Sequence, residues 1–323
     1  MRTGQDNNFG ITTMQYLKIF RPPNLAIIIL TQYLIRYCLL NPFYSASGVP
    51  FAIGSFDFAL LVLSTLLIAA GGNIINDITD IDSDRINKPE KLWIGKLMTK
   101  NNAYGLYITV TTVGVAIGFY LSFRIGYLMF GFIYLAIALM LFFYSSNYQK
   151  IAVAGNVIIS LLSAMVILIV WLFEFFALRS QPALFAKLMP VTGFAGKLIW
   201  SYAVFAFLTS LIREIVKDIE DAEGDKRAGY RTLPVVAGVS RTKTVVIALS
   251  VITMAALGFA QYKLTEHNMM MVFWYLLIAV QSLFAYLIYL TVKAKKKEDF
   301  KTVSDAAKIV MVAGILSMQL FCI

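Results

Sequence analysis

The sequence predicts an all-α, polytopic membrane protein with about nine transmembrane helices. Of its 323 residues, 59% are hydrophobic and only 14% are charged, and the apolar residues gather in nine long runs. A helix needs about 20 mostly apolar residues to cross a bilayer, and each run has roughly that length. Because lipid offers the backbone no hydrogen-bond partners, we expect every run to be helical and the chain to form one membrane domain over residues 1–323.

Polar connections separate the nine predicted spans. The second and sixth spans both end where a cluster of acidic residues begins, and the two clusters share the same spacing. This repetition favours an interpretation of the first eight spans as two similar four-helix halves, with the ninth span as an addition. In order, the spans cover residues 17–40, 57–77, 102–123, 126–144, 154–178, 198–217, 242–262, 270–292 and 304–323.

The basic residues predict how the chain is oriented in the membrane. Most of its 28 Lys and Arg residues lie in the N-terminal segment and in the connections after spans two, four, six and eight. Positive connections stay in the cytoplasm, so we expect the N-terminus inside, the C-terminus outside, and a location in the cell (inner) membrane. This distribution explains the net charge of +10 without nucleic acid as a partner. Both acidic clusters then open onto the cytoplasmic side.

The sequence predicts neither a cleaved signal peptide nor a chemical role for its cysteines or its histidine. Residues 1–16 are polar and mixed, without the basic, apolar and small-residue regions of a cleaved signal peptide. Cys38 and Cys322 lack metal-ligand spacing, and we expect no disulfide framework. The only histidine, His267, lies in a polar connection and receives no catalytic role. Carboxylates are therefore the main candidates for chemistry.

Ten of the 18 acidic residues fall in the two clusters, Asp77 to Asp84 and Glu214 to Asp225. In each cluster four polar residues follow the spacing i, i+4, i+7 and i+11, which places them within a roughly 60° arc of one helix face. Like charges stacked in this way repel each other, so a cation should compensate them. Hard oxygen ligands of this kind suit Mg²⁺. The four positions are Asn73, Asp77, Asp80 and Asp84 in the first cluster, and Glu214, Asp218, Asp221 and Asp225 in the second.

The three aspartates of each set form what we call an acid row, and each row precedes a basic connection. These connections cover residues 85–101 and 226–241. A diphosphate carries about three negative charges, which metals and Lys or Arg side chains neutralise together. Carboxylates beside bases therefore predict a site for a metal-bound diphosphate. The first acid row is Asp77, Asp80 and Asp84, and the second is Asp218, Asp221 and Asp225.

Two stretches resemble the motifs of a known family. The first is Asn-Asp-Ile-Thr-Asp-Ile-Asp-Ser-Asp-Arg-Ile-Asn-Lys-Pro, residues 76–89, which resembles the NDxxDxxxD signature of the UbiA-type intramembrane prenyltransferases. The second is Arg-Glu-Ile-Val-Lys-Asp-Ile-Glu-Asp-Ala-Glu-Gly-Asp, residues 213–225, which resembles that family's second aspartate motif. With Arg-Thr-Leu-Pro at residues 231–234, this part is most similar to the branch that prenylates glycerol phosphate lipids. The loop at residues 90–95 departs from many relatives and leaves the acceptor open.

The resemblance implies Mg²⁺-dependent transfer of a prenyl group, expected to be geranylgeranyl, from an isoprenoid diphosphate to a lipid acceptor. Each acid row would hold one Mg²⁺ ion, and the apolar bundle would keep water from the allylic cation. It also implies that a set of polar and basic residues binds the substrate. These residues are Asn24, Asn73, Asn76, Arg85, Tyr144, Lys150 and Arg227.

Several alternatives remain open from the sequence. The favoured acceptor is a prenylated glycerol phosphate, with an aromatic quinone precursor as the second choice and an intramembrane terpene cyclase as a related enzyme. A divalent-cation or proton-coupled transporter is the alternative from another class, although transporter acids usually lie near the bilayer midplane. Arg213 and Glu214 belong either to the site or to a structural ion pair, and Glu174 is expected at the membrane interface.

Overall fold

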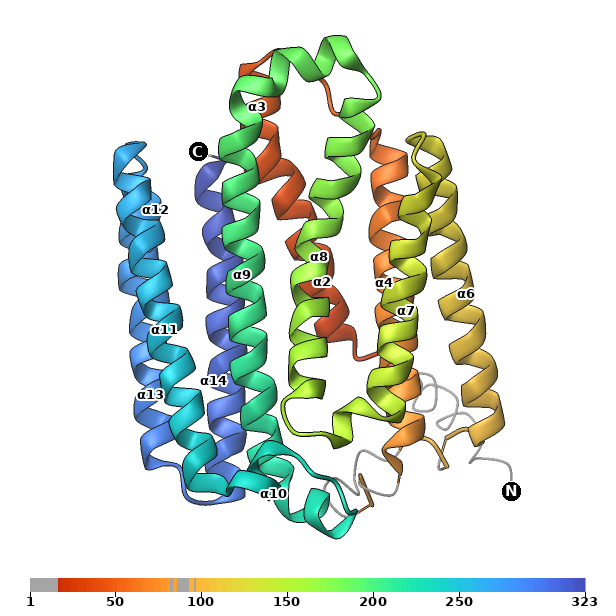
Figure 1. Cartoon of the computed structure of the whole chain (residues 1–323), viewed down its shortest axis with the longest axis vertical. Helices are drawn as coiled ribbons and strands as arrows, with labels where there is room; N and C mark the ends of the chain where they lie inside the picture. Colours follow the sequence, from red (N-terminus) through yellow and green to blue (C-terminus); the bar gives the residue numbers. More distant parts are fainter. Residues whose placement is uncertain (1–16, 82–83, 86–92, 96, 323) are drawn as a thin grey trace, which may run out of the picture. The chain divides into compact units, whose positions relative to one another are not determined.

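The computed structural model describes residues 17–81, 84–85, 93–95 and 97–322. Over these residues all regular structure is helical, and nine helices are long and apolar enough to cross a membrane (Figure 1). The predicted fold class is confirmed. The loop residues 90–92 and the N-terminal segment 1–16, on which two of the sequence interpretations depend, lie outside the described residues.

The helices divide into two compact units. Unit 1 comprises Met1–Ile29 and Ser55–Tyr148, and unit 2 comprises Leu30–Gly54 and Gln149–Ile323. The units divide the chain differently from the two predicted halves, because the first span is split and its part from Leu30 onward packs with the later helices. One cause is Gln32, whose buried amide donates to the carbonyl of Val166 at 3.2 Å.

Unit 1 is built from three long helices and the start of the first span. Glycines let these helices approach closely, as is common where helices pack in membranes. A Cβ on Gly118 would lie 2.3 Å from the ring of Tyr134, and the Ser64 hydroxyl donates to the Gly114 carbonyl at 2.7 Å. The helices of this unit are α4 (Ser55–Thr79), α6 (Lys100–Arg124), η3 (Leu128–Phe130) and α7 (Gly131–Ser146).

Unit 2 surrounds one very long helix, α9 (Pro182–Arg227). At about 1.5 Å per residue, its 46 residues are far longer than a bilayer is thick, so α9 extends beyond its predicted span at both ends. Figure 1 shows that α9 bends near its start, where Pro190 removes a backbone donor. Its last turns carry the second acid row, which begins beside the core residues Val216 and Ile219.

The other helices of unit 2 pack around α9. α8 and α14 make its most extensive contacts, and α11 adds a third neighbour. Gly314 of α14 faces Phe205 of α9 so closely that a Cβ would lie 2.1 Å from the ring. The helices are η1 (Ile35–Leu40), α3 (Asn41–Ala46), α8 (Ala154–Arg179), α10 (Leu233–Ala237), α11 (Val239–Glu266), α12 (Met270–Tyr275), η5 (Leu276–Gln281), α13 (Ser282–Lys293), α14 (Lys297–Leu316) and η6 (Ser317–Phe321), while α2 (Pro22–Leu34) runs from unit 1 into unit 2.

Two expectations about the outer end of unit 2 are wrong. Cys38 and Cys322 form a disulfide with an S–S distance of 2.10 Å, because packing brings together residues that are 284 positions apart. Glu174 does not lie at an interface with lipid but is 2% exposed. Its carboxylate accepts hydrogen bonds from the backbone of Ala52 at 2.6 Å and Ile53 at 3.3 Å, with Arg36 3.9 Å away. A buried charge requires such partners.

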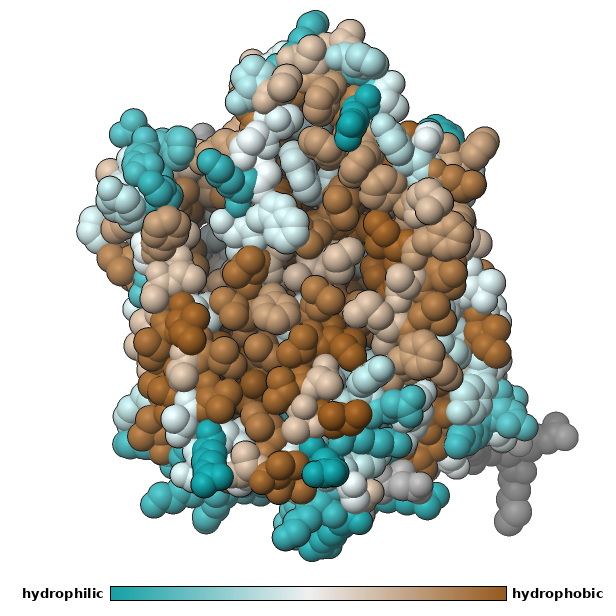
Figure 2. Space-filling model, viewed as in Figure 1, coloured by the Kyte–Doolittle hydropathy of each residue, from teal (hydrophilic) through white to brown (hydrophobic). Residues whose placement is uncertain are grey.

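Figure 2 shows where apolar side chains are exposed. Over α8, α9 and α11 in this view, brown apolar residues fill the middle of the helices and teal hydrophilic residues gather toward their lower ends. Large apolar side chains that face outward include Leu161, Trp200 and Phe259. A folded protein in water would not expose so many of them, whereas hydrocarbon lipid covers them.

Candidate active site

The first acid row continues the helical path of α4. Although α4 ends at Thr79, the Asp80 amide donates to the Asn76 carbonyl at 2.9 Å and the Asp84 amide to the Asp80 carbonyl at 2.7 Å. The helical spacing on which the row was predicted is therefore kept where the backbone is described. Asp77 is partly buried and Asp80 lies one turn further along.

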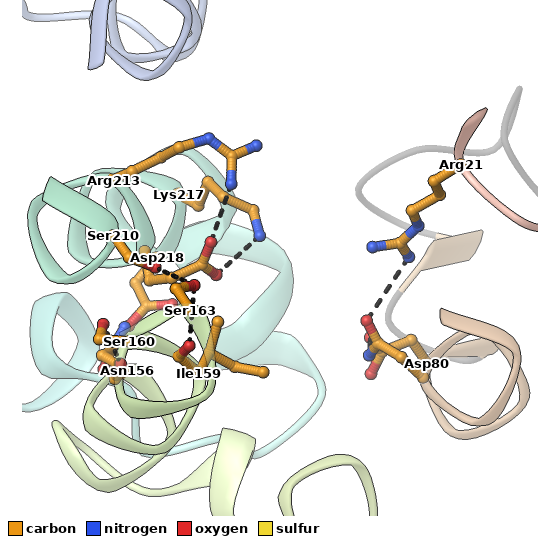
Figure 3. Close-up of polar contacts among 12 residues, drawn as sticks. Arg21, Asp80, Asn156, Ile159, Ser160, Ser163, Ser210, Arg213, Lys217 and Asp218 are labelled. Atoms are coloured by element: carbon orange, nitrogen blue, oxygen red, sulfur yellow. Dashed lines mark hydrogen bonds and ion pairs between the residues drawn. The ribbon is translucent and has the colours of Figure 1, made fainter. Parts of the chain in front are cut away.

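Arg21 supplies a cation to this row. Its guanidinium lies 2.5 Å from the Asp77 carboxylate and 3.5 Å from the Asn76 side-chain oxygen. Burial opposes ionisation of Arg21, but the charges of Asp77, and then of Asp80 and Asp84, raise its pKa above the ordinary value. The compensating cation that the sequence required is thus, in this structure, a side chain of the protein itself (Figure 3).

A short turn before α2 holds Arg21 in place. Ile19 is completely buried against Ile74, Ile75 and Ile78 of α4, which anchors the turn to the end of that helix. The Asn73 amide donates to the carbonyl of Phe20 at 3.1 Å. Arg21 itself has a φ of 53°, a conformation that residues other than glycine rarely adopt. The surrounding contacts therefore maintain a strained backbone that directs Arg21 at Asp77.

The second acid row is held by neutral hydrogen-bond donors. The Asn156 amide of α8 donates to the Asp218 carboxylate at 2.9 Å, and Asn156 is 6% exposed. At the end of α9, the Thr232 hydroxyl donates to Asp225 at 3.1 Å. Thr232 belongs to the Arg-Thr-Leu-Pro segment and precedes α10, so this segment folds back to fix the last aspartate of the row.

Glu214 lies one turn before the second acid row and is paired with two bases. The Arg213 side chain lies 3.0 Å and the Lys217 side chain 2.8 Å from the Glu214 carboxylate. Glu214 itself is buried, with 7% of its surface exposed. Figure 3 shows both basic side chains reaching toward the same group, with Asp218 and Asn156 beside them. Arg213 and Glu214 therefore form an ion pair, and this pair lies next to the candidate metal ligands. The sequence had left open whether these two residues belong to the site or to a structural ion pair.

The predicted substrate-binding residues of unit 1 lie near the first acid row or on α7. Asn73 and Asn76 face the turn and the row, and Asn76 donates to Asp80. Asn24 lies in the first turn of α2, where its backbone N–H donates to the Arg21 carbonyl at 2.9 Å. Arg85 directly follows the row and is exposed, and Tyr144 is half-buried near the end of α7.

The two predicted residues of unit 2 differ in their surroundings. Lys150 lies 5.4 Å from the ring of Tyr230, and its carbonyl accepts from the Arg231 amide at 2.9 Å, so it is next to the segment that fixes Asp225. Arg227 is exposed and paired with Glu223 on its own helix. That pairing turns Arg227 toward solvent and away from a direct part in the described network.

Sequence reasoning missed Asn156, Thr232 and the pairing of Arg21 with Asp77. Asn156 is a lone amide at the start of an apolar span, and only its contact with Asp218 gives it significance. Arg21 is not among the site residues that the sequence predicts. The signal that could have identified Asn156 is its position, because a polar residue inside a predicted span is a candidate for a functional role.

The donor set fits Mg²⁺. Within the described residues, no three acidic, His or Cys side chains are already arranged to hold a metal ion. Mg²⁺ does not require such a cage, because it is typically bound by one or two carboxylates together with waters and substrate phosphates. Both rows offer carboxylate oxygens at partly accessible helix ends, where Asp77 already attracts a cation. The residues present therefore match that ion's preference.

Helices long and apolar enough to cross a membrane, with carboxylates at the ends of two of them, are typical of an intramembrane enzyme. The sequence matches the UbiA prenyltransferase family over residues 34–312, and the chain belongs to that family. It is an integral membrane prenyltransferase, which sets aside the transporter alternative.

Similar proteins cover almost the whole chain. The digeranylgeranylglyceryl phosphate synthase of Methanosphaera stadtmanae is 26% identical over 94% of this chain and 98% of its own length. That of Methanocaldococcus jannaschii is 32% identical over 83% of this chain and 87% of its own. A solved structure of a digeranylgeranylglyceryl phosphate synthase in membranes has a TM-score of 0.60 at 27% identity, covering 96% of this chain and 98% of that one. A UbiA homologue from Aeropyrum pernix, 14% identical over 90% of this chain and 98% of its own, has the same fold with a TM-score of 0.60.

Proposed function

We propose that this protein transfers a geranylgeranyl group from geranylgeranyl diphosphate to a prenylated glycerol phosphate, with Mg²⁺ as the cofactor. The observation that supports this most directly is that basic side chains lie beside both acid rows, as a metal-bound diphosphate requires. Arg21 pairs with Asp77 of the first row, and Lys217 pairs with Glu214, one turn before the second row. Similarity to digeranylgeranylglyceryl phosphate synthases along nearly their full length supports the choice of acceptor.

The donor would be bound through its diphosphate. In each acid row the aspartates would hold one Mg²⁺ ion, and bound Mg²⁺ supplies positive charge that stabilises the diphosphate as a leaving group. Asn156 and Thr232 keep Asp218 and Asp225 in fixed orientations, so these carboxylates lose little freedom when they bind. Arg21 and Lys150 add cations near the rows, and we expect them to contact phosphate oxygens.

The reaction breaks the bond between the first carbon of the prenyl chain and the diphosphate oxygen, and the electron pair leaves with the diphosphate. The glycerol hydroxyl oxygen then forms the new ether bond to that carbon, and the hydroxyl proton is released. The protein's part is to exclude water from the allylic cation between these events, which its apolar helices can do. Aromatic faces can add cation–π attraction of about 0.5–2 kcal/mol.

The site would face the cytoplasm of a cell with this protein in its inner membrane. The connections after both acid rows are basic, which supports a cytoplasmic position for both rows. The prenyl chains of donor and acceptor would lie among apolar side chains and membrane lipid, while their phosphate groups remain at the membrane surface. Accordingly, both substrates would arrive from the membrane rather than from bulk water.

A direct assay tests this proposal. Purified protein in lipid vesicles is given labelled geranylgeranyl diphosphate with Mg²⁺, and geranylgeranylglyceryl phosphate or an aromatic quinone precursor is offered in parallel reactions. We expect a labelled ether lipid of the correct mass with the glycerol phosphate and none without Mg²⁺. Product with the aromatic acceptor alone would keep the mechanism and overturn the acceptor. Release of diphosphate with neither acceptor would favour a terpene cyclase.

A further inference from the structure

The polar face of α9 has two flanks with different chemistry. At about 100° per residue, Ser210, Lys217 and Asp221 lie near the middle of this face, whereas Arg213 and Asp218 lie on opposite edges. The Asp218 edge contacts α8, where Asn156 donates to it at 2.9 Å. The Asp218 edge contains the proposed metal ligand. A binding site for a second group would therefore lie on the Arg213 edge.

The Arg213 edge is next to α14. The Gly314–Phe205 contact fixes how α14 crosses α9, and the two helices run in opposite directions (Figure 1). Arg213 follows Phe205 by eight residues on α9, and Lys308 precedes Gly314 by six residues on α14. At about 1.5 Å per residue, both side chains are displaced from the crossing toward the same end of the unit, by about 12 Å and about 9 Å respectively. Their positive charges are close enough to act on each other. Two helices thus bring like charges together at one level of unit 2.

Arg213 keeps one donor available for a further partner. Among the described residues, Nε of Arg213 is buried without a hydrogen-bond partner, while its Nη1 binds Glu214 at 3.0 Å. Carboxylates also lie near these cations, with Glu214 beside Arg213 and Lys217, Asp218 beside Lys217, and Asp305 beside Lys308. A buried donor within a group of three cations favours an anion with several acceptor oxygens.

One turn deeper in the membrane, the same face carries neutral hydroxyls. The hydroxyls of Ser210 on α9 and Ser163 on α8 are hydrogen-bonded at 3.0 Å. Figure 3 shows the two side chains next to each other. Hydroxyl groups can bind the alcohol and ether oxygens of a lipid head group without the cost of burying charge. Along α9 toward its C-terminal end, the polar face therefore carries first hydroxyl groups and then cationic side chains. This order matches a glycerol lipid with a terminal phosphate.

We propose that Arg213, Lys217 and Lys308 bind the phosphomonoester of the lipid acceptor, and that the Ser163–Ser210 pair contacts its glycerol oxygens. The inference rests on the proposed function and specifies how that function selects its acceptor. It separates the two substrates on α9, because the metal ligand Asp218 is on the edge that faces α8 and the basic group is on the edge that faces α14. An aromatic acceptor without a phosphate would have no use for these three cations.

The test compares acceptors with and without the phosphate. Geranylgeranylglyceryl phosphate and dephosphorylated geranylgeranylglycerol are each given to wild-type protein and to the Arg213→Gln and Lys308→Gln variants. Since hydrogen bonds to charged groups are the strong ones, we expect KM for the phosphorylated acceptor to rise about 10- to 100-fold in either variant. KM for the donor, and kcat/KM for the dephosphorylated acceptor, should remain within about twofold of wild type. Lys301→Gln is the matched control, because Lys301 is an exposed lysine of the same helix.

A binding measurement supports the kinetic one. Glycerol 3-phosphate should compete with the phosphorylated acceptor in wild-type protein, and this inhibition should weaken in Lys308→Gln even if Arg213→Gln does not fold. Equal losses with both acceptors, or a rise in the donor's KM instead, would overturn the inference while leaving transfer intact. Absence of transfer to any glycerol lipid in wild-type protein would instead refute the proposed function, so the two failures are distinguishable.

Discussion

Arg21 and Asp77 form an ion pair with their charged atoms 2.5 Å apart, although 56 residues separate them in the chain. The pair joins the turn before α2 to the end of α4. Because the arginine already compensates a carboxylate of the first acid row, an incoming Mg²⁺ ion must compete with it. The internal cation therefore stabilises the metal-free protein and weakens the first contact with metal.

Arg21→Gln should lower stability without Mg²⁺ and increase the stabilisation that Mg²⁺ provides. The Arg21 side chain is 38% exposed, so solvent screens the pair and its loss should cost about 1 kcal/mol. Thermal unfolding in detergent, with and without Mg²⁺, measures both effects. The matched control is Arg124→Gln, which removes a pair with Asp57 at the other end of α4, at 3.0 Å. Mg²⁺ should not compensate for that change, and equal responses of the two variants would contradict the competition.

Asp77→Asn and Asp221→Asn should each abolish most activity while the protein still folds. Each change removes a charged metal ligand and relieves repulsion within its row. Asp77→Asn also loses the ion pair with Arg21, so its stability should fall by at most about 1 kcal/mol, whereas that of Asp221→Asn should not fall. Loss of a group that stabilises charge in the transition state typically costs about 10²- to 10³-fold in kcat. Asp82→Asn and Glu223→Gln, whose positions do not follow the i, i+4, i+7 and i+11 spacing, should be mild. Full turnover of both row variants with Mg²⁺ would show that the metal assignment is wrong.

Asn156→Ala should raise the Mg²⁺ concentration needed for half-maximal activity by about 10- to 100-fold, because groups that orient metal ligands have effects of this size. The amide donates to Asp218 at 2.9 Å, and Asn156 is buried. High Mg²⁺ should restore part of the activity. Val157→Ala, at an exposed position of α8 next to Asn156, should leave the Mg²⁺ dependence unchanged. A lower kcat with an unaltered Mg²⁺ dependence would argue against a positioning role.

Reduction or replacement of the disulfide should destabilise the protein without changing its chemistry. Cys38 and Cys322 are cross-linked, and no described cysteine is free. Cys38→Ser should shorten the half-life of the folded protein at raised temperature, because a disulfide typically contributes about 2–4 kcal/mol to the free energy of unfolding. Maleimide labelling of the denatured wild type should require prior reduction. Labelling without reduction would show that the bond is absent.

Features that depend on one helix could be predicted from the sequence. The spans follow from apolar runs, and the acid rows follow from a helical spacing that α9 and the extension of α4 retain. Both depend only on residues close to each other in the chain.

Features that depend on packing between helices could not be predicted. Asn156 meets Asp218 across 62 positions, and Cys38 meets Cys322 across 284. Glu174 was misplaced for the same reason, since its partners Ala52 and Ile53 lie in a connection far earlier in the chain. Spacing carries no information about such contacts.

The disulfide also has a consequence for how the protein is made. One of its cysteines lies in the first span and the other follows the ninth, on the residue after η6. A ribosome must therefore synthesise every helix before the bond can close, and the insertion machinery must deliver both ends to the same side of the membrane. A non-reducing gel of newly made chains would thus separate fully inserted molecules from those whose last helix has not yet crossed.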